Sequence, residues 1–500
     1  MYLNCEGIAK IPGLGNSSAQ SGSCDLKTYA RNSDAWLVVL LGGPDCGDTA
    51  VAIHNPTGEA EEIVGVRRGF GADSQYAFSS MRQRLREWGS SVWVITLAAL
   101  ALRLAYLGYM AHLIPSRVLA EVPFQNEVGN VAAALARGDG FCCLFRQATG
   151  PTAWLSPVYP LLVAGIFKIL GTFTLASFYG AVILNCLFSA AATVPLFFAG
   201  KRIAGAGTAG LAAWIWAIFP SGVILPFEWI WDTSLSVLLA AAVLWATLRL
   251  KESATSRACA LYGLWWGVAL LTNPALGAVL PFLGGWLVYQ WRGQRAVQLR
   301  FVAVSVGVAV LMCLPWTARN YREFGRFIPM RSNFAFEFWS GNNEIFDENS
   351  RAINRITRYE QAHLYAEQGE NGFLDAKMQD ARKFVKAHPA LYARLFGRRV
   401  VATWLGTESP WYDFWHADSW LARFLILWNA AILAGILWGL PRLYREQRLY
   451  FVPVASYPIL FPLTFYVAHT TLRHRHPCDP ILALLVAIAI LGVKLESRMK

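Results

Sequence analysis

The sequence predicts an all-α polytopic membrane protein. Of its 500 residues, 55% are hydrophobic and only 15% are charged, whereas a soluble protein would have about 25% charged residues. The apolar residues collect in runs of about 20, the length that crosses the hydrocarbon core of a bilayer. Lys and Arg cluster in short links between these runs, so the net charge of +12 is explained by membrane topology and does not indicate nucleic-acid binding.

Residues 1–80 differ from the rest of the chain. They are polar, rich in Gly and Ser, and have no sustained apolar period, and "WLVVLLGG" at Trp36–Gly43 is too short to span a bilayer. "MRQRLREWGSSVWVITLAALALRL" then begins at Met81 with a basic tip and an apolar run, as the natural start of a membrane protein does. We therefore interpret residues 1–80 as a disordered cytoplasmic extension or a mis-assigned start.

Ten apolar runs after Met81 are predicted to cross the membrane. They lie at about 92–114, 174–199, 203–221, 223–249, 258–273, 275–291, 299–316, 420–440, 449–468 and 479–494. A shorter run at about 157–171 raises the count to eleven if it crosses fully.

Charge predicts which links face the cytoplasm. The basic links should all lie inside; they are "RQRLR", "KR" (Lys201–Arg202), "RLKESATSR", "WRGQR", "PRLYREQR" and "KLESRMK". They alternate correctly if 157–199 contributes one net crossing, with the short run partial or re-entrant. We therefore expect a multi-pass inner-membrane protein whose unusual polar residues face the periplasm or outside.

This topology divides the chain after residue 80 into three parts. The first, 81–316, is a transmembrane module with a first outer loop at 115–156. The second, 317–418, is an outer loop region with helical spacing but thin apolar content, so we expect it to pack on the membrane part. The third, 419–500, contains the C-terminal transmembrane helices.

The first outer loop carries the leading catalytic candidate. Glu127 lies in "NEVGNVAAALARG", a helical pattern that ends at Gly138 and has Phe124, Val128, Val131 and Leu135 on one face. A partly desolvated carboxylate beside that face holds a proton more readily, which suits a general base or a charge partner. A solvated loop acid is the alternative interpretation.

Arginines collect at the predicted outer ends of spans. Arg319 and Arg322 follow "LPW", while Arg473, His474 and Arg475 precede the last span in "RHRHP". Arginine binds phosphate bidentately and stays charged, so these groups would suit a lipid-linked phosphate or diphosphate. Contact with anionic lipid headgroups is the alternative, although positive charge is normally kept off the outer side.

Two further acids lie near the outer end of a span. Glu228 and Asp232 are four residues apart on one helical face, and Arg103 lies in the middle of the first span. Acids in spans are costly and often functional. An ion pair with Arg103 and a ligand role are both open. The nine cysteines have no metal spacing, and we assign them no disulfide or metal role.

Several segments together resemble the lipid-phosphate-sugar-dependent GT-C glycosyltransferases, which include the protein mannosyltransferases and the aminoarabinose transferase of lipid A. The resemblance covers about residues 81–500. It rests on the acid-bearing first loop and on "PTAWLSPVYPLLVAGIFKILG", "LTNPALGAVLPF", "PWTARNYREFGRFIPMRSNFAFEFWSGNN", "KAHPALYARLFGRR" and "LRHRHPCDPILALL".

The resemblance implies a GT-C type helix bundle and a role for each matched residue. Glu127, in "QNEVGN", takes the position of the catalytic base, where the family often has Asp or an Asp-Glu pair. His474 stands where the family pattern has Tyr, and Ser156-Pro157 replaces a His-Pro-Pro. The expected phosphate-binding residues are Arg319, Arg322, Arg473, Arg475 and His474. The expected cavity residues are Tyr159, Glu228, Asp232 and Asn343.

The expected reaction transfers a sugar from a polyprenyl-phosphate donor to a lipid, glycan or protein acceptor, with inversion. Polyprenyl phosphate is a good leaving group, so the chemistry needs a base for the acceptor and positive charge for the phosphate. Glu127 with Glu228 or Asp232 could hold a divalent cation, and metal dependence is left open. The alternative function is a lipid or solute transporter or flippase, which should show repeated halves and polar groups along a path through the membrane.

Overall fold

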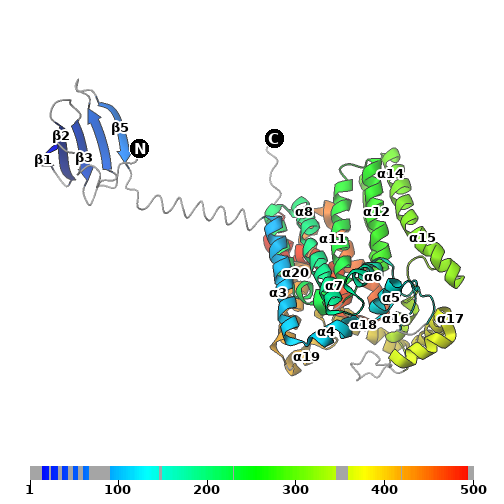
Figure 1. Ribbon diagram of the computed structural model, residues 1–500. Coiled ribbons are helices and arrows are strands. Elements are labelled where there is room, and N and C mark those ends of the chain that lie inside the picture. Colours follow the sequence, from blue (N-terminus) through cyan, green and yellow to red (C-terminus); the bar gives the residue numbers. More distant parts are fainter. Residues whose placement is uncertain are drawn as a thin grey trace. The chain divides into compact units, whose positions relative to one another are not determined.

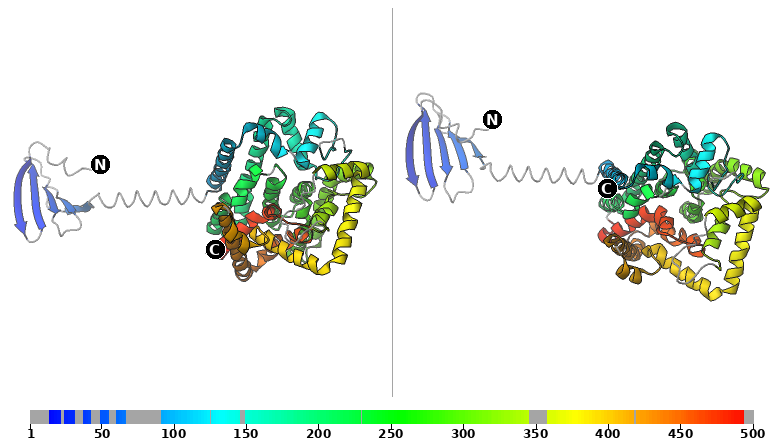
Figure 2. Two further views of the ribbon diagram at one scale, coloured as in Figure 1. Left: turned by 90° about the horizontal axis from the view of Figure 1, so that it is seen from below. Right: turned by 60° about the horizontal axis from the view of Figure 1, so that its bottom comes forward.

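The computed structural model describes two compact units, Met1–Trp88 and Gly89–Lys500 (Figures 1 and 2). The described residues are 14–21, 24–31, 37–42, 49–54, 60–66, 91–124, 126–145, 149–228, 230–344, 358–417 and 419–493.

The described part of the first unit is an antiparallel sheet with the order β1-β2-β3-β4-β5. Its strands are β1 (Leu14–Ser21), β2 (Cys24–Arg31), β3 (Leu37–Gly42), β4 (Thr49–His54) and β5 (Ala60–Val66). Strands β3 and β4 contain the β-branched runs of "LVVLLG" and "TAVAIH", residue types that favour extended backbone. These strands pair in a segment expected to be a disordered extension or a mis-assigned start; that interpretation of residues 1–80 stays a prediction.

The second unit is a bundle of α-helices, as the sequence predicts. Its first half contains α3 (Val92–Leu113), α4 (Ser116–Glu121), η1 (Val122–Phe124), α5 (Glu127–Arg137), α6 (Val158–Leu170), α7 (Leu175–Ala191), α8 (Thr193–Ala204), α9 (Ala206–Ala217), α10 (Pro220–Glu228), α11 (Thr233–Leu250), α12 (Ser256–Thr272), η2 (Pro274–Ala278) and α13 (Leu280–Gln290). Its second half contains α14 (Arg295–Phe301), η3 (Val302–Val306), α15 (Gly307–Phe324), α16 (Phe334–Ser340), α17 (Arg358–Ala387), α18 (Pro389–Leu405), α19 (Pro410–His416), α20 (Trp420–Glu446), η4 (Arg448–Tyr450), α21 (Phe451–Leu460), α22 (Leu463–Val467), α23 (Leu472–Arg475), η5 (His476–Cys478) and α24 (Asp479–Leu491).

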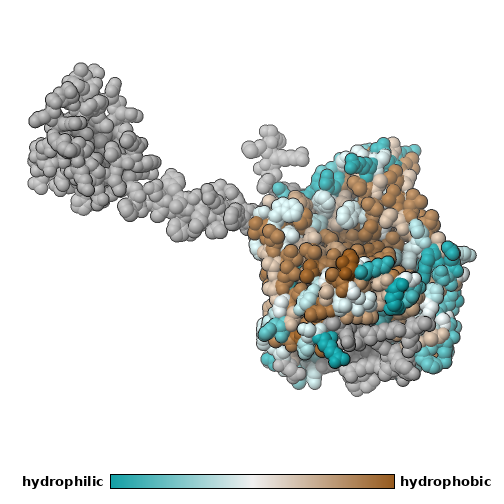
Figure 3. Space-filling view, viewed as in Figure 1, coloured by the Kyte–Doolittle hydropathy of each residue, from teal (hydrophilic) through white to brown (hydrophobic). Residues whose placement is uncertain are grey.

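Among the described residues, eight helical segments are long and apolar enough to cross a membrane, which confirms the polytopic prediction. A brown apolar belt covers the visible face of the bundle in Figure 3, between teal polar zones. Helices α3 and α20 expose large apolar side chains such as Trp93, Leu97 and Trp438, whereas α11 and α24 are mostly buried. The peripheral helices therefore present the lipid-facing surface, and α11 and α24 form the centre.

Two predicted boundaries differ from the observed ones. The predicted break at 222 is misplaced, because α10 continues to Glu228 and α11 begins only after Asp232. The runs at 258–273 and 275–291 form α12 and the shorter pair η2 and α13, which Asn273 and Pro274 separate. An Asn cap followed by Pro favours a new helical start over continuation.

Helix α6 is too short to cross the membrane alone. Its 13 residues give a length of about 20 Å at about 1.5 Å per residue, against a hydrocarbon core of about 30 Å. The chain turns at Gly171, where φ is 88°, and α7 and α8 then run on from Leu175 to Ala204. This arrangement agrees with the expectation that 157–199 makes one net crossing.

Four of the six basic links lie within the described residues, and these four meet at one end of the bundle; "RQRLR" and "KLESRMK" lie outside the described residues. Arg202 pairs with Glu252, and the backbone carbonyl of Lys251 accepts a hydrogen bond from Trp291 Nε1 at 3.3 Å. The Lys251 ammonium lies 5.9 Å from the ring centre of Tyr450. Figure 1 places α4, α5 and α16–α19 at the other end. The loop helices and the basic links therefore occupy opposite ends.

Candidate active site

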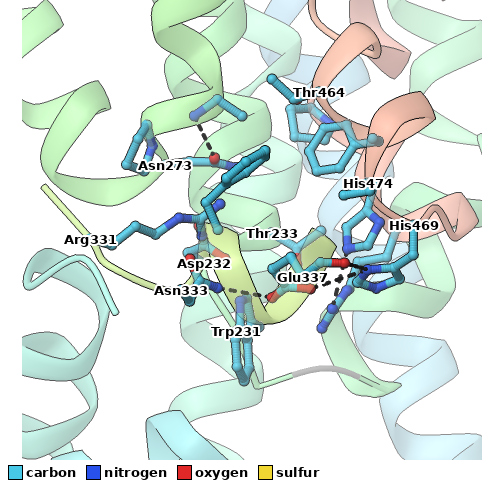
Figure 4. Close-up of a pocket in the computed structure, with 17 residues that line it drawn as sticks. Trp231, Asp232, Thr233, Asn273, Arg331, Asn333, Glu337, Thr464, His469 and His474 are labelled. Atoms are coloured by element: carbon cyan, nitrogen blue, oxygen red, sulfur yellow. Dashed lines mark hydrogen bonds and ion pairs between the residues drawn. The ribbon is translucent and has the colours of Figure 1, made fainter. Parts of the chain in front are cut away.

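Five segments far apart in sequence line a cavity of about 260 Å³ whose wall carries both charged and apolar side chains. They are the turn before α11, the α12–η2 junction, the segment around α16, the end of α22 and helix α23. The cavity is lined by Trp231, Asp232, Thr233, Asn273, Pro274, Ala275, Arg331, Asn333, Phe334, Glu337, Thr464, Phe465, Ala468, His469, Arg473, His474 and Pro477. Figure 4 shows Arg331 and Asp232 on one side and the two histidines on the other.

Arg331 lies in an irregular segment that other residues hold in place. Trp316 Nε1 donates to the carbonyl oxygen of Met330 at 2.5 Å, Thr317 Oγ1 donates to that of Pro329 at 2.9 Å, and Asn320 Nδ2 donates to that of Ile328 at 3.0 Å. These donors come from "PWTARN" in α15. This motif therefore fixes the backbone that leads to Arg331.

The other side of that segment is fixed by a buried carboxylate. Glu370 accepts hydrogen bonds from Ser332 Oγ at 2.6 Å, Thr152 Oγ1 at 2.6 Å and Tyr365 OH at 2.5 Å. The backbone N–H of Ala153 also donates to it at 3.0 Å. Glu370 is 4% exposed, and its oxygens join the first loop, the Arg331 segment and α17.

Arg473 and His474 reach the cavity from α23. The guanidinium of Arg473 lies 5.2 Å from the ring centre of Trp231. His474 Nδ1 accepts a hydrogen bond from the backbone N–H of Thr471 at 3.2 Å, and the His474 ring stacks on Phe465 at 4.6 Å. His474 is thus held in one orientation, while Arg473 brings a positive charge to the wall.

Asp232 is the buried acid of the cavity. It precedes the first turn of α11, and Ser236 Oγ donates to its Oδ2 at 3.4 Å. Asn273 Nδ2 donates to the same Ser236 Oγ at 3.3 Å, which links α12 to α11. Burial raises the pKa of Asp232 from 3.8 to about 6, against the opposing effects of Arg331 and Arg473.

Glu337 and His469 form a carboxylate–imidazole pair on the wall. Glu337 Oε2 lies 3.2 Å from His469 Nδ1, and Asn333 Nδ2 donates to Glu337 Oε1 at 2.9 Å (Figure 4). Ser340 Oγ lies 3.3 Å from the same histidine nitrogen. The pair brings α16 and the end of α22 together.

Arg399 fastens the backbone behind this pair. Its Nη1 donates to the carbonyl oxygen of Val467 at 2.9 Å, and its Nη2 donates to that of Gly341 and to Asn342 Oδ1. Arg399 is 4% exposed and is the last residue of the "KAHPALYARLFGRR" segment in α18. That segment therefore ties the chain after α16 to the chain after α22.

Glu127 lies next to this site but does not line the cavity itself. It is the first residue of α5, where Asn126 Oδ1 accepts from the backbone N–H of Gly129 at 2.8 Å, and it is half-buried. A Cβ at Gly129 would lie 2.2 Å from the carbonyl oxygen of Phe124, so the close approach requires glycine. The carboxylates of Glu127, Asp232 and Glu337 all act electrostatically on Arg473.

Three of the predicted phosphate-binding arginines lie elsewhere. Arg319 donates to the carbonyl oxygens of Thr152 at 2.7 Å and Phe141 at 2.8 Å, so it holds the first loop. Arg322 is exposed on α15 and does not line the cavity. Arg475 is fully buried beside Asp479. Charge alone could not separate these arginines from Arg473.

The predicted cavity residues are also divided. Asp232 lines the cavity, and Tyr159 is buried nearby, where its hydroxyl donates to Asn185 Oδ1 at 2.8 Å. Glu228 is exposed. Asn343 is buried, and its Nδ2 donates a hydrogen bond to the carbonyl oxygen of Trp339. Neither of the last two lines the cavity.

The proposed ion pair of Arg103 with Glu228 or Asp232 is wrong. The Arg103 guanidinium donates to Ser189 Oγ at 2.9 Å and to the backbone carbonyls of Ala99 and Ala217. Within the described ranges, no group of three or more His, Cys, Asp or Glu side chains could hold a metal ion.

Sequence reasoning missed Arg331, Glu337, His469 and Asn273 as site residues. All except His469 stand inside segments already noted for the resemblance, and His469 opens "HTTLRHRHPCDP". Asn273 and His469 stand at the ends of predicted spans, a signal that could have found them, whereas Arg331 and Glu337 lie well inside the outer loop region, where no such signal marks them.

The fold and the site define a polytopic helical membrane protein with a cation-bearing cavity at the loop end of its bundle. Among solved structures, it is similar to the Archaeoglobus fulgidus oligosaccharyltransferase, with a TM-score of 0.47, 14% identity and coverage of 80% of this chain and 48% of that chain. It is also similar to ArnT from Cupriavidus metallidurans bound to undecaprenyl phosphate, with a TM-score of 0.32, 13% identity and coverage of 78% and 77%. The chain spans about half the length of the archaeal enzyme.

No protein-family model matches the chain, and no curated protein matches it.

Proposed function

We propose that the chain is a membrane glycosyltransferase that moves a sugar from a polyprenyl-phosphate donor to an acceptor, with inversion, at the cavity below α23. The observation that supports this most directly is the convergence of Arg331 and Arg473 in one cavity, with Glu127 within electrostatic range of Arg473. The four described basic links lie at the opposite end of the bundle, and positive links favour the cytoplasm. The cavity would then face the outer side of an inner membrane.

The cavity has the chemistry for the phosphate of the donor. Arginine guanidinium groups bind phosphate oxygens in a fixed fork and remain charged. Arg331 and Arg473 would hold the phosphate, and the stacked rings of His474 and Phe465 would form the wall beside it. Preorganised positive charge of this kind stabilises the negative charge that grows on a leaving phosphate.

Glu127 is proposed as the general base for the acceptor. In the transfer step, the acceptor oxygen forms a bond to the anomeric carbon as its proton passes to the Glu127 carboxylate. The bond from the anomeric carbon to the phosphate oxygen breaks, and its electron pair leaves with polyprenyl phosphate. Attack from the face opposite the phosphate gives inversion.

A transporter would need polar groups along a path through the membrane. Ionisable residues do lie inside the bundle, at Arg103, Arg475 and Asp479. Arg103 is bonded to backbone carbonyls and Ser189, and Arg475 is bonded to Asp479. Their bonding explains them as structural groups, so the transferase is favoured.

The first test identifies the donor and then removes the base. Lipid extracted from the purified full-length protein is analysed by mass spectrometry for a polyprenyl-phosphate sugar, and that compound is used in transfer assays in membranes. Glu127→Gln should lower the transfer rate by about 10²–10⁴-fold, the usual contribution of a general base. Glu367→Gln, an exposed acid on α17, is the matched control. Near-normal transfer by folded Glu127→Gln would reject the base assignment.

A further inference from the structure

The ring of His469 lines the cavity, and its Nδ1 atom faces oxygen atoms of Glu337. The Nδ1 atom lies 3.2 Å from Glu337 Oε2 and 3.4 Å from the backbone carbonyl oxygen of Glu337, both of which accept hydrogen bonds. The Nδ1 atom therefore carries the hydrogen, because both oxygens beside it are acceptors. This leaves Nε2 for a ligand in the cavity.

The charges of the cavity also call for another positive group when an anion binds. The two arginines that line it, Arg331 and Arg473, are balanced formally by the two acids that line it, Asp232 and Glu337. A phosphate would enter a cavity with no formal excess of positive charge. Binding can restore the balance by taking up a proton on an imidazole, and His469 and His474 are the two imidazoles that line the cavity.

His474 is a poorer candidate for that proton. Its Nδ1 already accepts the hydrogen bond from the Thr471 backbone N–H, and its Nε2 faces the Arg473 guanidinium at 3.5 Å. A proton added at Nδ1 would break the first contact, and positive charge on the ring would be repelled by Arg473. His469 instead has a carboxylate beside it.

We propose that His469 is a third phosphate-binding group, whose Nε2–H donates to an oxygen of the lipid-linked phosphate, and that binding of this phosphate takes up a proton held by the His469–Glu337 pair. The proposal rests on the proposed function and adds a residue and a proton to it. The charged or titratable groups that face His469 are Glu337 on α16, Arg473 and His474 on α23 and, across the cavity, Asp232 and Arg331.

Binding of undecaprenyl phosphate is the direct test. The dissociation constant of the full-length protein in phosphatidylcholine nanodiscs is measured at pH 6 and pH 8 for the wild type, His469→Gln and Glu337→Gln. The phosphate of the ligand changes its charge with pH in the same way in every experiment. The ratio of the variant's dissociation constant to that of the wild type therefore reports only the effect of the protein's own groups. His469→Gln should bind about tenfold more weakly at pH 6, the effect of one charge-assisted hydrogen bond, and close to wild type at pH 8.

Glu337→Gln separates this role from a purely structural one. It removes a negative charge from the cavity, so binding at pH 8 should become several-fold tighter, and the gain on lowering the pH should shrink because the imidazolium loses its carboxylate. A structural defect would weaken binding at both pH values. His363→Gln is the control, because His363 and Glu367 form an exposed pair with the same 3.2 Å distance.

The outcomes are distinct. Suppose that the wild type binds undecaprenyl phosphate and that His469→Gln and His363→Gln have the same dissociation constant at both pH values. That result would overturn the His469 proposal and leave the proposed transferase intact. Weaker binding by Glu337→Gln at both pH values would also overturn it, even if His469→Gln did not fold. If the wild type bound no undecaprenyl phosphate at pH 6 and none at pH 8, the proposed class of donor would itself be contradicted.

Discussion

The two halves of the RHRH sequence at 473–476 lie in different environments. Arg473 and His474 line the cavity, whereas Arg475 and His476 are fully buried. The buried pair shares one carboxylate: Arg475 Nε donates to Asp479 Oδ1 at 3.0 Å, and His476 Nδ1 lies 2.8 Å from Asp479 Oδ2. One short helix and its continuation thus supply a cavity wall on one side and a buried polar cluster on the other.

The buried arginine illustrates how a charge becomes purely structural. Arg475 also donates to the backbone carbonyls of Thr403 and Trp404 and to Asn429 Oδ1. These contacts join α18, α20 and α24. A buried charge without such partners costs several kcal/mol, so each contact is required once the residue is inside. Identical residue types thus have different roles because of their surroundings.

The largest effect should come from breaking the buried cluster. Arg475→Met removes the guanidinium partner of the buried Asp479 and leaves that carboxylate only His476 and Ser221, which should lower the free energy of unfolding by about 3–5 kcal/mol. Arg473→Met should change stability by less than about 1 kcal/mol, because its side chain faces the cavity, and should weaken undecaprenyl phosphate binding at least tenfold. Thermal unfolding in detergent and lipid binding measure the two effects. An equal loss of stability in both variants would contradict the assignment of a structural role to Arg475 and a cavity role to Arg473.

A second large effect should come from Glu370, which supports the cavity from outside. All its partners are donors, so Glu370→Gln would place an amide N–H against one of them. The loss of those hydrogen bonds should cost about 1–3 kcal/mol. It should also loosen the segment that holds Arg331 and weaken phosphate binding. Tyr365→Phe, which removes one donor, should cost about 1 kcal/mol and separates loss of one bond from loss of the junction.

Asp232 allows a test by pH. Its pKa is raised from 3.8 to about 6 by burial, so its contribution to stability is fully present below pH 3.8 and is lost as the pH rises through 6. Asp232→Asn should therefore raise the unfolding temperature relative to wild type most at pH 8, by less at pH 5, and hardly at all below pH 3.8. The expected shift at pH 8 is a few degrees.

Asp375 gives the control of opposite sign. The hydrogen bond from Arg326 lowers its pKa, so its contribution is present above the ordinary carboxyl pKa and is lost as the pH falls. Asp375→Asn should lower stability slightly at pH 8, by under about 1 kcal/mol because the pair is exposed. A stabilised Asp375→Asn or a destabilised Asp232→Asn at pH 8 would contradict the assigned directions.

The local features of the fold could be predicted from sequence. Apolar runs gave the bundle, and the pattern from Asn126 to Gly138 gave α5, because caps and periodicity are encoded within a few residues. The break between α10 and α11 was misplaced, since the apolar run continues through Ile230 and Trp231 and apolarity alone does not mark the turn before α11.

The site could be predicted only in part. Asp232, Arg473 and His474 were found because charge near a span end is unusual. The partners Arg331, Glu337 and His469 were missed because their importance arises from the meeting of α16, α22 and α23, which no local spacing encodes. Arg319 and Arg475 were assigned to the phosphate for the same reason: their acceptors are backbone carbonyls and a buried acid that only the fold brings close.

The smallest effect should come from Arg322, an arginine outside both environments. It is exposed on α15, three residues after Arg319. Arg322→Ala should change the free energy of unfolding by no more than about 0.5 kcal/mol, as surface substitutions usually do, and should leave the dissociation constant for undecaprenyl phosphate within twofold of wild type. A tenfold loss of binding would show that the phosphate reaches beyond the cavity to this helix. Arg319→Met, by contrast, should lower stability, because it removes the donors that hold the first loop through Phe141 and Thr152.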